Sequence, residues 1–145
     1  MRAADLCLVQ ATFARVATDP QVFAETLCTQ LFSIDPSIQD LFDDDPVITV
    51  KKMGGMLAHL VANMHDPRRV LPSLRSLAQR HVASGVEHRH YAIFGEALLR
   101  TLSSLLGHDF TEAARQAWIS VYEMIAREMI ASAEQMIHFL EMQHE

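Results

Sequence analysis

The chain of 145 residues has little of what marks several common classes of protein. It contains two cysteines, Cys7 and Cys28, which gives no disulfide framework; both lie in helical apolar patterns that predict buried, reduced thiols. Twelve basic residues against eighteen acidic ones give a net charge of −6, with no basic face for nucleic acid. The longest apolar stretch, residues 53–64, is too short to span a membrane, and residues 1–30 lack the pattern of a cleaved leader. We therefore expect a cytoplasmic protein with neither a nucleic-acid partner nor a membrane span.

Signals for β-structure and for familiar catalytic loops are missing as well. There is no Asn-Gly or Asp-Gly hairpin pair, no glycine-rich phosphate loop, no Gly-x-Ser-x-Gly elbow and no Cys-x-x-Cys. Eight histidines would allow a zinc site, but His88 and His90 are two residues apart and face different ways on a helix. Half of the residues are hydrophobic, at helical spacing, in a chain long enough for one core. These features predict a single all-α domain over residues 1–145.

Asp-Pro pairs divide the first half of the chain. They are Asp19-Pro20, Asp35-Pro36, Asp45-Pro46 and Asp66-Pro67. Aspartate accepts hydrogen bonds from the free N–H groups at a helix start, and proline fits the first helical position because its missing N–H is not needed there. Each pair therefore predicts the beginning of a helix.

The apolar spacing and the stop signals predict where these helices run and which side is buried. We expect helices at about 3–17, 20–33, 36–42, 46–64, 67–84, 88–106 and 111–141. Leu6, Phe13, Phe23, Leu98, Trp118 and Ile137 are among the side chains expected to face the core. Gly54 and Gly55 each cost roughly 1 kcal/mol in mid-helix relative to alanine, which indicates close approach of another helix.

His81 lies on the apolar face of the 67–84 helix, four residues before the helix-ending Gly85. A buried imidazole needs a partner for each ring nitrogen, because an unpaired buried polar group costs roughly 1–3 kcal/mol. Two interpretations are open from this helix alone: a core histidine bonded to backbone, or a ligand to a buried metal or haem.

The order of landmarks along nearly the whole chain resembles a globin. The match is to single-domain bacterial haemoglobins, the globin half of flavohaemoglobins, and neuroglobin. It is carried by Leu31-Phe32, Pro36, Leu41-Phe42, Leu71-Pro72, Arg80-His81, Gly85-Val86, His90-Tyr91, Gly95, Leu98-Leu99, Leu105-Leu106-Gly107, Phe110-Thr111, Ala117-Trp118 and Tyr122. The resemblance implies a helical sandwich of about seven to eight helices around a pocket for haem b.

By this resemblance His81 matches the proximal histidine that ligates the haem iron. Phe42 matches the phenylalanine wedged against the porphyrin, and Tyr91 matches a tyrosine beside the proximal histidine of flavohaemoglobins. Those proteins complete the set with a glutamate whose place here falls on Ala133, next to Glu134. The remaining residues expected to contact the cofactor are Leu77, Val86, Phe94, Lys52 and Met53.

The distal side departs from the family. The resemblance places Cys28 where flavohaemoglobins carry a ligand-binding tyrosine, with Leu27 and Phe32 also expected in the ligand pocket. Counting back from His81 puts Thr49 at the usual distal glutamine or histidine, with Met53 one turn further on. Lys52 has two interpretations: it binds a propionate or solvent, or it occupies the iron itself in the resting state, a role for which Met53 is the alternative.

The resemblance implies reversible binding of O2, CO or NO, in oxygen transport or in handling of nitric oxide. We do not expect an enzyme on its own; the alternative is nitric oxide dioxygenation, which would need an external reductase as a partner. The alternative is a globin-fold sensing or interaction module with a hexacoordinate or absent haem. Apolar residues in the last helix, among them Ile137, Phe139 and Leu140, favour a homodimer in either case.

Overall fold

The computed structural model describes residues 2–143, and these are helical without a strand. The α-helices are α1 (Ala3–Val16), α2 (Pro20–Ile34), α3 (Pro46–Asn63), α4 (Pro67–Ala83), α5 (His88–Leu106) and α6 (Glu112–Gln143), with short 3-10 helices η1 (Pro36–Leu41) and η2 (Gly107–Asp109). The all-α prediction is confirmed, with helix ends within a few residues of those expected. No helix in this part of the chain is long and apolar enough to cross a membrane.

All four Asp-Pro pairs begin helices, as predicted. The carboxylates of Asp19, Asp35, Asp45 and Asp66 accept hydrogen bonds from backbone N–H groups two or three residues later, at 3.0 to 3.2 Å. Thr111 caps the last helix in the same way, accepting from the N–H of Ala114 at 3.1 Å. Local hydrogen bonding alone therefore defines most helix starts in this chain.

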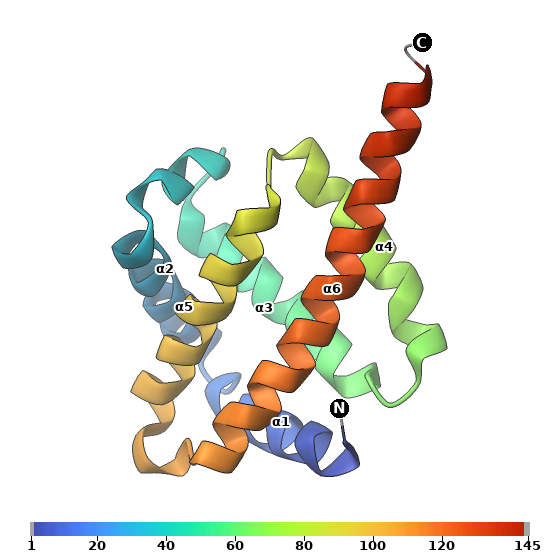
Figure 1. The fold of residues 1–145 in the computed structure, drawn as a ribbon. Helices are drawn as coiled ribbons and strands as arrows, with labels where there is room; N and C mark the ends of the chain where they lie inside the picture. The colour runs from blue at the N-terminus through green and yellow to red at the C-terminus, as the bar shows by residue number, and fades with distance from the viewer. Residues whose placement is uncertain (1, 144–145) are drawn as a thin grey trace.

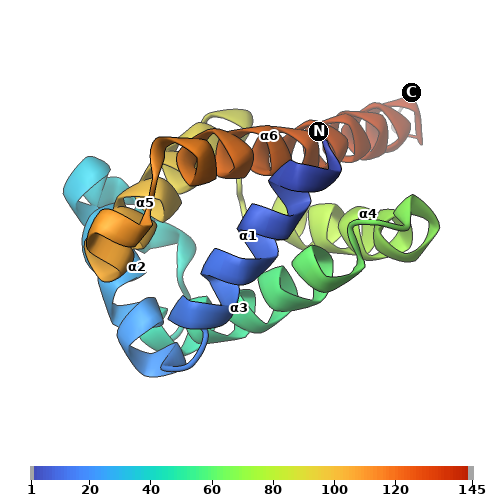
Figure 2. The ribbon, with the colours of Figure 1, turned by 90° about the horizontal axis from the view of Figure 1, so that it is seen from below.

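The helices form a sandwich in which α6 crosses α1 and α4, while α2 packs on α3 and α5 (Figures 1 and 2). One continuous core runs through these layers, from Val9 in α1 through Leu27 and Leu98 to Met129 in α6. Deep in this core the indole N–H of Trp118 donates to the hydroxyl of Thr12 at 2.8 Å, which satisfies both buried groups.

Of the two adjacent glycines in α3, Gly54 lies at a close contact with another helix and Gly55 does not. A Cβ on Gly54 would lie 3.5 Å from the ring of Phe23, so α2 approaches this face closely as expected. A Cβ on Gly55 would meet nothing within 4 Å. The close approach predicted from the pair therefore belongs to Gly54.

Two burial predictions are wrong. Cys7 is exposed, whereas Cys28 is buried as expected. Ile137 is 45% exposed, because the last turns of α6 extend past the other helices (Figure 1). In both cases the apolar period continues to the edge of the core, where no neighbouring helix covers it.

Candidate functional site

A cavity of about 330 Å³ lies between α3 and α4 and is bordered by α2, η1, α5 and α6. Its wall is mostly apolar. It is lined by His81 together with the expected Phe42, Thr49, Met53, Leu77, Val86, Tyr91 and Phe94. The structure thus brings together, around one space, eight of the residues chosen from the sequence.

His81 is carried to this cavity by the way α4 ends. Gly85 has a φ of +89°, a left-handed conformation that favours glycine. The N–H of Val86 donates to the carbonyl of His81 at 2.9 Å and that of Gly85 donates to Val82 at 3.1 Å. This pair of bonds is the Schellman motif, and it turns the chain so that Val86 joins His81 on the cavity wall.

The imidazole of His81 has a defined tautomer. Its Nδ1 lies 2.7 Å from the carbonyl oxygen of Leu77, one turn earlier, and since a carbonyl can only accept, Nδ1 carries the proton. Nε2 then holds a lone pair, and within residues 2–143 the hydrogen bond of this ring is the one at Nδ1. Burial lowers the pKa of His81, the Leu77 bond opposes this, and the charge of Arg80 adds to the lowering. The site therefore presents a neutral imidazole with a free ligating nitrogen.

Aromatic side chains support the imidazole from behind. The ring of Tyr91 lies nearly parallel to that of His81, and the hydroxyl of Tyr122 donates to the backbone carbonyl of Tyr91 at 2.5 Å. Tyr122 also stacks on Phe94, with 6.1 Å between ring centroids. A Cβ on Gly95 would lie 2.5 Å from Cε1 of Tyr122, so only glycine lets this ring pack so closely on α5.

The opposite wall is one face of α3. Thr49, Met53, Met56, Leu57 and Leu60 follow one another at helical spacing and all line the cavity. Thr49 carries the only side-chain hydrogen-bond donor on this face, because thioethers and hydrocarbon side chains have none. This side of the cavity can therefore offer little polar stabilisation to a bound molecule.

Four residues expected at the site lie elsewhere. Lys52 is exposed and borders an outer surface hollow together with Lys51 and Asp45. Leu27 and Cys28 are buried in the core, where desolvation, with the nearby charge of Asp45, raises the pKa of Cys28 to about 11. Phe32 packs edge-on against Phe42, at 5.9 Å between centroids, and reaches the cavity only through that ring.

Sequence reasoning also missed residues that do line the cavity. The set comprises Leu31, Ile38, Leu41, Met56, Leu57, Leu60, Arg80, Ser84, His90, Tyr122, Ile125, Ala126 and Met129. Most belong to apolar stripes that the helical period identified as buried, but the period does not distinguish a cavity wall from a packed core. Arg80, Ser84 and His90 gave no such signal, because polar side chains near a helix end are usually solvated.

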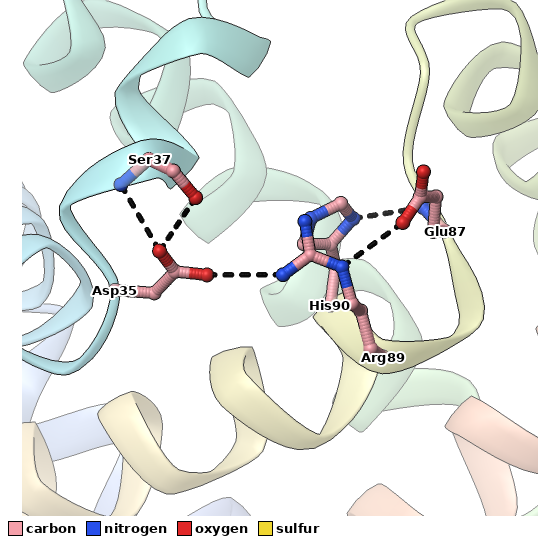
Figure 3. A network of polar contacts seen from close by, with 5 residues as sticks. All are labelled: Asp35, Ser37, Glu87, Arg89 and His90. Carbon is pink, nitrogen blue, oxygen red and sulfur yellow. Dashed lines mark hydrogen bonds and ion pairs between the residues drawn. The ribbon is translucent and has the colours of Figure 1, made fainter.

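A polar network holds the start of α5 against the α2–η1 corner (Figure 3). Arg89 donates to Glu87 at 2.9 Å and to Asp35 at 3.2 Å. Asp35 in turn accepts from the N–H and the hydroxyl of Ser37. Beside this bridge the backbone N–H of Glu87 donates to Nδ1 of His90 at 2.8 Å. The network fixes the side of the cavity at which α4 and α5 meet.

Helical layers around an apolar cavity that is lined by His81 define an all-α protein with an internal cavity. A family model for globins matches residues 25–129. The chain belongs to the globin family.

Named relatives agree with this assignment. The chain is 27% identical to a flavohemoprotein of Bordetella parapertussis over 122 residues, covering 82% of this chain but 30% of that protein. It is 31% identical to the neuroglobin of Danio rerio over 117 residues, covering 71% of this chain and 74% of the relative. Among solved structures, an engineered carbene transferase from Rhodothermus marinus superposes with a TM-score of 0.87 at 23% identity, over 97% and 99% of the two chains. The chain thus spans about 30% of the length of the flavohemoprotein it matches.

Proposed function

We propose that this globin binds haem b through Nε2 of His81 and reversibly binds diatomic gases there. The observation that carries the proposal is the free ring nitrogen of His81 at an apolar cavity. The residues present fit the group, because a neutral imidazole is the usual donor to haem iron and the surrounding wall is apolar and aromatic. The core shared by Val9 and Met129 supports treating residues 1–145 as one domain.

Each side chain has a defined part in this proposal. Phe42, Leu77, Val86 and Phe94 pack on the cofactor and exclude water from it. The hydrogen bond to Leu77 orients the imidazole of His81, while the ring of Tyr91 supports it. When bound, haem supplies an iron with one coordination position open to O2, CO or NO.

The His81 side of the cavity favours reversible binding of a gas over cleavage of the bond within the gas molecule. Nδ1 of His81 donates to a neutral carbonyl rather than to a carboxylate, so the imidazole stays neutral. Ala133 stands where the resemblance would require a glutamate, and the adjacent Glu134 is exposed. We therefore infer a role in oxygen transport or nitric oxide handling, with nitric oxide dioxygenation requiring electrons from an external reductase.

The distal side sets how firmly a gas is held. Thr49 is the only donor on the α3 wall, so we infer weaker stabilisation of O2 than a tyrosine–glutamine pair provides. Because Met53 lines the cavity whereas Lys52 is exposed, Met53 is the better candidate for a resting sixth ligand. Leu27, Cys28 and Phe32 act in this proposal by packing behind the pocket.

A sensing or interaction module is the second candidate function. It is favoured by the exposed apolar side chains of Ile137, Phe139, Leu140 and Met142 at the end of α6. A homodimer through this face stays a prediction, which sedimentation at high concentration would test. The free thiols of Cys7 and Cys28 support a reducing, cytoplasmic location.

Titration of the purified chain with haem tests the leading function. We expect saturation at one haem per chain with a sharp Soret band, and O2 that leaves completely when its pressure is lowered. A chain that stays colourless, or that takes up haem without a defined end point, would contradict the proposal.

A further inference from the structure

The outer face of α4 carries a basic patch, formed by Arg68, Arg69, Arg75 and Gln79. All four side chains are exposed, and Arg68, Arg75 and Gln79 follow one another at helical spacing on one side of the helix. The helix itself contains no Asp or Glu, although the whole chain has a net charge of −6. The sequence shows this patch only as the adjacent pair Arg68-Arg69, because Arg75 joins the pair only in the folded helix.

The patch keeps a net positive charge in the fold. Asp66 lies 3.6 Å from Arg68 and 3.5 Å from Arg69, so a single carboxylate faces two guanidinium groups. Arg75 takes part in none of the ion pairs found among residues 2–143. The patch can therefore attract an anionic surface from outside the protein.

His81 lies on the opposite side of the same helix. It shares the inner side of α4 with the buried Val70, Leu74 and Ala78, and it lines the cavity. An α-helix with its side chains is about 10–12 Å across. A protein that docks on the basic patch therefore lies about one helix diameter from the imidazole assigned above to the iron.

The other side of the molecule has the opposite charge. Residues 17–45 contain seven Asp or Glu and no Lys, Arg or His. They include α2 and η1, which lie on the side of the molecule away from α4 (Figures 1 and 2). An acidic partner is thus repelled from one side and attracted to the other, so the charges of the chain orient it towards α4 before contact.

The basic patch offers no apolar anchor. The large hydrophobic side chains exposed among residues 2–143 belong to α2, α3 and α6, and none belongs to α4. A charged surface without apolar anchors favours brief, electrostatically steered encounters, as between electron-transfer proteins, over a stable complex. It also lacks the apolar side chains with which a helix enters a membrane surface.

We propose that the basic patch of α4 is the docking surface for an acidic protein that donates one electron at a time. The inference rests on the function proposed above, because it names the partner that keeps the iron in the state that binds gases. In each encounter the donor loses one electron and ferric haem iron gains it to become ferrous, with no bond or proton exchanged. Arg80 is not part of the patch, since it lines the cavity.

The test uses flavodoxin, an acidic one-electron donor, as the probe for the haem-loaded chain. Stopped-flow absorption at the Soret band gives the rate at which reduced flavodoxin reduces the ferric chain under CO. Titration calorimetry with oxidised flavodoxin gives the affinity, which does not depend on electron transfer. Both are measured for the original chain, Arg75→Glu, Arg75→Lys and Arg115→Glu. Arg115 is the matched control, because it is exposed on α6, takes part in no ion pair among residues 2–143 and undergoes the same change of charge.

We expect the reversal of charge in Arg75→Glu to lower both the rate and the affinity about ten-fold at low ionic strength. Arg75→Lys, which keeps the charge, and Arg115→Glu should each change them by less than about two-fold. The difference between Arg75→Glu and the original chain should vanish in concentrated salt, where the Debye length falls to about 3 Å at 1 M.

Equal rates and affinities for Arg75→Glu and Arg115→Glu would overturn the inference, while a haem-loaded chain that binds CO would leave the proposed function intact. Vesicles of phosphatidylcholine with anionic phosphatidylglycerol test a lipid surface in place of a protein. Binding to them that is lost in Arg75→Glu, with flavodoxin unaffected, would also overturn the inference. A chain that takes up no haem would overturn both, because the electron would have no acceptor.

Discussion

The rings of His81 and Tyr91 lie nearly parallel, with 6.3 Å between their centroids and 23° between their planes. Tyr91 is itself held by Tyr122, whose hydroxyl donates to its backbone carbonyl. The imidazole is thus supported on one face by an aromatic ring from α5 and oriented at one edge by the carbonyl of Leu77. This arrangement leaves Nε2 as the one reactive atom of the ring.

Replacing His81 by glycine should remove the ligand while leaving space for a substitute. We expect His81→Gly to lose the haem spectrum of the original chain, and added imidazole to restore most of it by entering the vacated volume. Absorption spectra with and without imidazole check this. His88→Gly is the control, since His88 is exposed and does not line the cavity. An unchanged spectrum in His81→Gly would contradict the assignment of the iron ligand.

Gly95→Ala and Gly55→Ala should change stability in opposite directions. At position 95 the new methyl group would lie 2.5 Å from Cε1 and 2.9 Å from Cδ1 of Tyr122, and overpacking of this kind costs about 1–3 kcal/mol. At position 55 nothing lies within 4 Å, so alanine should stabilise the helix by roughly 0.5–1 kcal/mol. Urea denaturation gives both free energies of unfolding. A stable Gly95→Ala chain would show that Tyr122 can move aside.

Thr49→Val removes the only donor on the α3 wall while keeping its shape. We expect O2 to dissociate about five-fold faster, equivalent to about 1 kcal/mol for one neutral hydrogen bond. Lys52→Ala, the exposed neighbour, should leave both the rate and the ferric spectrum unchanged. Stopped-flow measurement of the O2 dissociation rate checks both variants. Dissociation from the original chain as slow as from a flavohaemoglobin would contradict the account of a weakly polar distal side.

Stability should fall as the pH is lowered, because burial lowers the pKa of both His81 and His90 in the fold; His90 can be tested separately. Burial lowers its pKa in the fold, an effect that Arg89 adds to and that Glu87 and Asp35 oppose. As the pH falls through 6.5, the unfolded chain takes up this proton first and folding is disfavoured. We expect a smaller loss of stability between about pH 7.5 and 5.5 in His90→Asn. The lowered pKa values of Asp5 and Asp35 act only at more acid pH, below 3.8. An identical loss in the variant would contradict this origin.

The features predictable from the sequence were those fixed by local chemistry. The four Asp-Pro caps and the turn at Gly85 depend on hydrogen bonds within a few residues, so their positions follow from the sequence itself. On the α3 wall only Thr49 and Met53 were predicted, and they came from the resemblance by counting back from His81; Met56, Leu57 and Leu60 line the same face and were missed.

The parts that could not be predicted depend on which helix covers which face. In α2 the apolar stripe is broad because the helix packs on both α3 and α5. Leu31 borders the cavity, whereas Leu27 and Cys28 do not, and the apolar spacing alone did not distinguish these positions. The exposure of Lys52 likewise depends on the rotation of α3. The fit of Tyr122 against Gly95 and the places of Arg80 and His90 on the cavity wall arise only when distant segments meet.

The central claim is that a neutral His81 holds a haem whose other side is open to a gas. Its most direct test is the absorption spectrum of the haem-loaded, reduced chain before and after addition of CO. The account predicts a single, complete shift of the Soret band, reversed when CO is removed. A chain that binds no haem, or a Soret band that CO does not move, would contradict it.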